Sequence, residues 1–122
     1  MLVSITRKDF GYDLAAWHEA LRRRVKAFSN VLRALDEDLA RPGTFVIAAT
    51  RLGGRHGYDE TGAVAPMGGA VTGLAKAFQR ERPETFVKAV DFAPGRQTAA
   101  LADVLIDETL RDPGAVEIGW EN

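Results

Sequence analysis

A glycine-rich segment carries the side chains of this sequence that are best suited to bind a ligand. The segment, residues 51–65, follows a continuous apolar run and contains four glycines. Its polar side chains include Arg51, Arg55, His56, Tyr58 and Asp59. Ligands usually bind at the carboxyl edge of a parallel sheet, and at that edge the two arginines of the segment would favour an anionic ligand. The alternative, which we favour, is a solvated loop or one that packs on a neighbouring subdomain.

The sequence gives no evidence for a metal site or for thiol chemistry. The chain has no cysteine, which excludes disulfides, thiolate catalysis and zinc–thiolate sites. His56 and Asp59 at loop spacing do not make a metal site, and His18 is too distant along the chain to be assumed nearby. We therefore expect no bound metal.

The charges of the chain are balanced, with 16 basic and 17 acidic residues and a net charge of −1. The densest basic run is Arg22-Arg23-Arg24 with Lys26, and a helix would spread these residues around its axis. A solvated face is therefore expected rather than a nucleic-acid patch. The apolar start, residues 1–5, is too short for a signal peptide or a membrane span. We expect a cytoplasmic protein that binds neither nucleic acid nor membranes.

Strand and helix signals alternate along the chain. Apolar residues at steps of three and four from Leu14 to Leu39 predict one long helix, which Asp13 caps. Further helices are predicted from Pro66 to about Arg82 and over 98–111, and strands over 2–5, 44–50, 86–92 and 115–120. The order βαβαβαβ predicts one α/β domain over 1–122, with about four parallel strands and three helices in two or three layers.

The aromatic residues of this pattern are expected to pack. Trp17 and Phe28 belong to the apolar stripe of the long helix and are predicted to lie in the core. Trp120 is predicted to pack in the last strand or to form part of a joint to a following domain.

Four short motifs occur in a fixed order over residues 45–51, 69–78, 81–84 and 87–91. They are a strand ending in Thr-Arg, a Gly-Leu helix, a Glu-x-Pro-Glu corner and a Val-Asp strand. Over residues 44–120 the chain thereby resembles the structural half of the ketoreductase region in type I polyketide synthases and polyunsaturated fatty acid synthases. This region belongs to the short-chain dehydrogenase superfamily. The resemblance implies a truncated Rossmann-like fold whose last crossover is left-handed, which would send helix 98–111 to the opposite sheet face.

The catalytic positions of that family are vacant in this chain. Counting back from Gly73 of the Gly-Leu step places Gly68 in the lysine position and Val64 in the tyrosine position, and neither side chain can move a proton. The serine position falls near Thr50 and Arg51. No Gly-x-Gly-x-x-Gly turn exists to hold a dinucleotide. The resemblance therefore implies no catalytic residue and no cofactor bound by this chain.

Three functions fit these observations. The leading one is a catalytically silent subdomain that supports the NADPH-dependent ketoreductase of a polyketide synthase or fatty-acid-synthase-like multienzyme. The second is a small α/β anion-binding module that acts through the 51–59 loop. The third is half of a short-chain reductase, completed in trans by a chain with the nucleotide site. Both sheet faces look apolar, so a bare face and the edge at 2–5 should meet the catalytic half, other domains of the multienzyme or a second copy in a homodimer.

Overall fold

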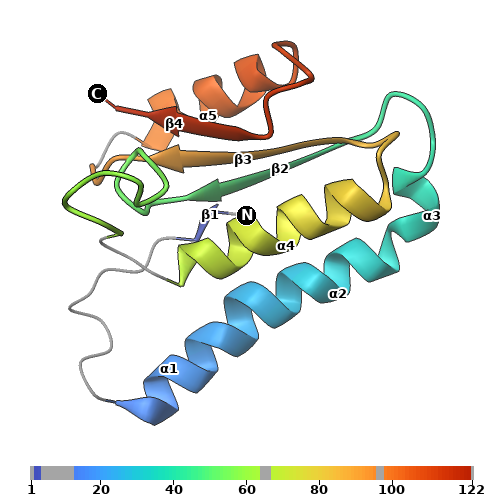
Figure 1. The fold of residues 1–122 in the computed structure, drawn as a ribbon. Helices are drawn as coiled ribbons and strands as arrows, with labels where there is room; N and C mark the ends of the chain where they lie inside the picture. Colours follow the sequence, from blue (N-terminus) through green and yellow to red (C-terminus); the bar gives the residue numbers. More distant parts are fainter. Residues whose placement is uncertain (1, 4–12, 64–66, 96–97, 122) are drawn as a thin grey trace.

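A parallel sheet forms the centre of the fold (Figure 1). The computed structural model describes residues 2–3, 13–63, 67–95 and 98–121. The strands are β1 (Leu2–Val3), β2 (Phe45–Thr50), β3 (Phe86–Phe92) and β4 (Glu117–Trp120). All neighbours pair in parallel, and the strands lie side by side in chain order, β1-β2-β3-β4. The predicted α/β class with a parallel sheet is confirmed.

The helical region before β2 contains a π turn and one break, at Leu35. It consists of α1 (Leu14–Leu21), a π-helical segment η2 (Arg22–Lys26), α2 (Ala27–Ala34) and α3 (Asp36–Leu39). The predicted long helix is confirmed from Leu14 to Ala34, with a π turn at η2 inside it. Leu35 then leaves helical geometry at φ −101° and ψ 10°, so the predicted extension to Leu39 is a separate short helix. The predicted cap is confirmed, since the Asp13 carboxylate accepts the N–H groups of Ala15 and Ala16.

The π turn also explains an error in the predicted core. A π turn holds more residues than an α turn, so apolar positions before and after it no longer share one helix face. Phe28, after the turn, is buried as predicted, with 8% of its surface exposed. Trp17, before the turn, is 43% exposed, and its assignment to the core is wrong.

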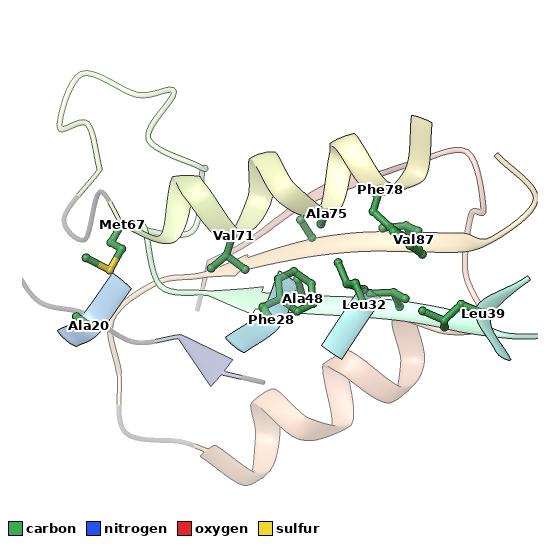
Figure 2. Packing of buried hydrophobic residues seen from close by; sticks show 12 residues of the cluster. Ala20, Phe28, Leu32, Leu39, Ala48, Met67, Val71, Ala75, Phe78 and Val87 are labelled. Atoms are coloured by element: carbon green, nitrogen blue, oxygen red, sulfur yellow. The ribbon is translucent and has the colours of Figure 1, made fainter. Parts of the chain in front are cut away.

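Helices cover both faces of the sheet, which gives three layers. On one face, α1, α2 and α3 share a core with α4 (Gly68–Glu81) and with Val46, Ala48, Val87 and Ala89 of the sheet (Figure 2). On the other face, α5 (Thr98–Glu108) packs against Ala49, Val90 and Phe92. The expectation that this last helix crosses to the opposite face is confirmed.

The remaining boundaries lie close to the predicted ones. The strand over 86–92 is confirmed, α5 ends at Glu108 instead of residue 111, and β4 begins at Glu117 instead of residue 115. The start of α4 is observed at Gly68, and Pro66 lies outside the described residues. Trp120 pairs with Phe92 in the sheet. Within the described residues, no helix is both long and apolar enough to cross a membrane.

One part of the sheet stays open on the α5 side. Phe45 and Ile47 alternate with the core residues of β2 and therefore face the α5 side, at the strand next to β1. Phe45 is 53% exposed and Ile47 is half-buried. We call these two residues the apolar shelf.

Candidate functional site

A buried carboxylate organises the loop that follows β2. Asp91 lies in β3 opposite Thr50 and is fully buried. Its Oδ1 accepts the Thr50 hydroxyl at 2.8 Å and the N–H of Leu52 at 2.5 Å. Its Oδ2 accepts the N–H groups of Gly54 at 2.7 Å and His56 at 2.9 Å. Four hydrogen bonds thus compensate the loss of hydration of this charge.

The backbone of the loop forms a cradle around this carboxylate. Alternate amides of one segment, at residues 52, 54 and 56, converge on the two oxygens of Asp91. Such convergent N–H groups form an anion-binding concavity. The conformation requires left-handed backbone at His56, with φ 54°, and at glycines on either side of it. The predicted anion loop therefore already holds an anion, which is the protein's own carboxylate.

The two arginines of the loop are engaged in different places. Arg51 donates from its Nη1 to the carbonyl oxygen of Gly95 at 2.8 Å, in the connection between β3 and α5. Arg55 makes two parallel hydrogen bonds to the carboxylate of Glu121, at 2.5 and 2.8 Å. These bonds hold the pKa of Glu121 below its usual value and raise the pKa of Arg55. The loop therefore does not direct both guanidinium groups to one point.

The aromatic side chains of the loop lie along β4. Nε2 of His56 is 3.0 Å from the carbonyl oxygen of Ile118. Because a carbonyl only accepts, Nε2 carries the proton in this contact. The Tyr58 hydroxyl donates to the carboxylate of Glu117 at 3.2 Å, and Lys76 of α4 pairs with the same carboxylate at 3.2 Å. These side chains are thus bound to the protein itself, although the buried Nδ1 of His56 has no hydrogen-bond partner among the described residues.

The loop lies directly on the last strand. Gly54 has φ +92°, and a Cβ at this residue would come within 2.8 Å of the Trp120 carbonyl oxygen. A Cβ at Gly119 would overlap the carbonyl of Gly54. A hollow of about 420 Å³ remains beside the loop, but Glu117 and Glu121 belong to its lining. An external anion at this hollow would meet two carboxylates.

Little space remains around Gly68, the residue that the resemblance assigns to the lysine position of a reductase. Gly68 is buried at the start of α4, and a Cβ there would lie 3.1 Å from Cγ and Cδ2 of Leu52 and 3.3 Å from Cβ of Thr50. The position therefore has no room for a lysine side chain. The serine position is predicted near Thr50 and Arg51; the Thr50 hydroxyl is buried and donates to Asp91, and Arg51 donates to the Gly95 carbonyl. Val64, in the tyrosine position, lies outside the described residues.

Metal ligands do not gather in the described part of the chain. Within it, no group of three or more His, Asp or Glu side chains could hold an ion. The carboxylate of Asp59 accepts the N–H of Gly62 in a local turn, and His18 stacks near Trp17 on α1. These two residues therefore do not join His56 in one site.

The most important polar residue of this site, Asp91, escaped prediction from the sequence. Its signal is an acidic residue in a strand that is apolar except for Asp91 and Lys88. That signal alone does not reveal the partners, because they come from the register of β2 on β3 and from the path of the loop.

Comparison with known proteins gives no assignment for this chain. No protein-family model matches it, and neither does any curated protein or solved structure. Its function therefore has to be inferred from its own residues and geometry.

Replacing Asp91 by Asn should destabilise the fold strongly. The Asn side chain has one acceptor oxygen, and its NH₂ group takes the place of the second carboxylate oxygen. This NH₂ group would face backbone N–H donors, so at least one buried donor loses its acceptor. We expect the free energy of unfolding, measured by urea denaturation, to fall by about 2–4 kcal/mol. Asp59→Asn is the matched control, because Asn keeps the Oδ1 that accepts the Gly62 N–H, and it should change stability by less than about 0.5 kcal/mol. Equal stability of the two variants would contradict the role of Asp91.

Adjacent glycines at the start of α4 should respond differently to alanine. Gly68→Ala forces a methyl group against Leu52 and Thr50 and should lower the free energy of unfolding by about 1–3 kcal/mol. Gly69→Ala meets nothing within 4 Å and should leave stability unchanged or raise it by up to about 1 kcal/mol. The measurement is chemical denaturation of both variants beside the wild type. A Gly68→Ala variant that gains as much as Gly69→Ala would show that the position is open.

Proposed function

We propose that this chain is a catalytically silent structural subdomain that supports the ketoreductase of a polyketide-synthase-like or fatty-acid-synthase-like multienzyme. The observation that carries the proposal is the closed position at Gly68. In a reductase-like scaffold this position would hold the lysine that assists proton transfer, and here Leu52 and Thr50 fill the space in front of it. Thr50 supports the same conclusion, because its buried hydroxyl is committed to Asp91.

The topology supports a dehydrogenase-like scaffold. The strands follow one another in chain order, α4 packs on one face and α5 packs on the other. Two crossovers between adjacent parallel strands must then differ in handedness, and left-handed crossovers are rare. The motif resemblance implies a left-handed crossover at the same helix. The topology and the motifs therefore both support a dehydrogenase-like scaffold.

The open edge of the sheet supports a mechanical role. β1 pairs on one side with β2 and forms the edge of the described sheet. The apolar shelf, Phe45 and Ile47, lies on the α5 face of the neighbouring strand β2, ahead of the residues Ala49 and Thr50 that pair with β1. Parallel sheets are normally covered on both faces, and exposed strand edges are usually protected. A catalytic half that continues the sheet past β1 would cover both features, and burying Phe45 completely would contribute about 1–2 kcal/mol.

The two other functions have weaker support. An anion-binding module would use the hollow beside Arg55, His56 and Tyr58, but Arg55 is already paired with Glu121. A reductase completed in trans would need a proton relay from this chain, which the filled space around Gly68 opposes. We therefore retain the structural subdomain as the conclusion.

A catalytically silent chain should neither bind nor oxidise NADPH. We expect no saturable change in NADPH fluorescence and no loss of absorbance at 340 nm with a β-ketoacyl thioester, because Gly68 stands in the expected lysine position and the Thr50 hydroxyl is bound to Asp91. An active short-chain ketoreductase assayed in parallel serves as the positive control. Saturable binding or turnover by the purified chain would refute the proposal.

The apolar shelf should be dispensable for the stability of the chain itself. Phe45→Ser should change the free energy of unfolding by less than about 1 kcal/mol and should reduce binding of the dye ANS, because Phe45 is exposed. Val87→Ser, on the neighbouring strand but buried, should cost about 2–4 kcal/mol. A large loss of stability in Phe45→Ser would mean that the shelf is already covered by the chain.

A further inference from the structure

The connection through α5 poses a folding problem. Crossovers between parallel strands are right-handed in about 98% of cases. The helices before β2 and before β3 share one sheet face, while α5 lies on the other face (Figure 1). The rule therefore identifies β3–α5–β4 as the left-handed crossover. Something in the chain must direct α5 to the face that a crossover normally avoids.

Apolar contacts alone do not distinguish the two faces of β3. One face presents Val87 and Ala89, and the other presents Val90 and Phe92, all of them buried. Apolar attraction is non-directional and depends on the area removed from water. On its sheet-facing side α5 offers Leu101, which is buried, and Val104 and Leu105, which are half-buried. Ile118 of β4 also packs on this side, so the apolar contact of α5 involves β4 as well as β3.

One polar interaction is specific to the α5 face. Lys88 of β3 has 0% of its surface exposed, and its Nζ lies 2.7 Å from Oε2 of Glu108 in α5. The same Nζ donates to the carbonyl of Arg111 at 3.0 Å, just beyond the end of that helix, and lies 5.3 Å from the centre of the Phe86 ring. A cation at this place also meets the negative end of the helix dipole.

We propose that the buried Lys88–Glu108 pair determines the face on which α5 packs, and so specifies the left-handed crossover. If α5 lay on the other face, Lys88 would lose both Glu108 and the Arg111 carbonyl. A buried ammonium without a partner is strongly unfavourable, so this alternative fold is penalised. The pair is thus a determinant of conformational specificity, which is independent of the function proposed above.

The test separates specificity from stability. Lys88→Met and Glu108→Leu each leave an uncompensated buried charge, and each should lower Tm on the order of 10 °C or more. The double variant removes both charges while keeping apolar volume, and should recover most of this loss. In the double variant, however, amide exchange over 98–108 should become about tenfold faster or more, because α5 no longer has one defined position.

The position of α5 can be measured directly. The chain has no cysteine, so spin labels can be placed at cysteines replacing the exposed residues Arg80 of α4 and Asp103 of α5. With the native pair, the labels should show one narrow distance distribution across the sheet. With the double variant, the distribution should broaden and gain shorter distances. A double variant with the native distribution and native exchange rates, or one no more stable than the single variants, would overturn the inference.

Discussion

The acceptance of four hydrogen bonds by the buried carboxylate of Asp91 is the constraint on which the rest of this structure depends. It ties the end of β2, through the Thr50 hydroxyl, to three amides of the loop that follows. Hydrogen bonds to a buried charge contribute about 1.5–3 kcal/mol each, and leaving such a charge without them would cost more. The path of the loop, the closeness of Leu52 to Gly68 and the contact of Gly54 with β4 all follow from this arrangement.

The outer contacts of the loop are weaker and act as support. Arg55 and Glu121 are both largely exposed, and exposed ion pairs contribute little to stability and are screened by salt. Because folding lowers the pKa of Glu121, this pair favours the fold at neutral pH. Its contribution disappears as the pH falls through the lowered pKa of Glu121. The buried carboxylate therefore determines the loop, and the surface pair adds to it.

Strand β3 carries two charged residues in an otherwise apolar sequence, and each one binds a segment on a different face of the sheet. Asp91, at its carboxyl end, holds the loop that lies against the start of α4. Lys88 lies three residues earlier on the opposite face of the sheet and binds the end of α5. Since each charge is satisfied by a group from a distant part of the chain, each specifies a tertiary contact rather than a local one. The carboxyl end of β3, an edge at which parallel sheets usually bind ligands, is thereby occupied by the protein's own loop.

Much of the fold could be predicted from the sequence, because it depends on local patterns. The periodicity of apolar residues indicated the strand and helix order, and the type and position of Asp13 indicated the helix cap. The π turn at Arg22–Lys26 was not predictable, since the apolar spacing continues through it. The exposure of Trp17 follows from that turn. The partners of Asp91 and Lys88 were hidden for a different reason: two charged residues in an apolar strand are visible in the sequence, but the groups that satisfy them depend on register and on which face each helix covers.

Amide hydrogen exchange of the wild-type loop tests the central claim most directly. If the carboxylate of Asp91 holds the loop as a packed element, the amides of Leu52, Gly54 and His56 should exchange as slowly as those of β3, while exposed loop amides such as that of Glu60 should exchange quickly. Rapid exchange of all three, at the rate of a solvated loop, would contradict the account.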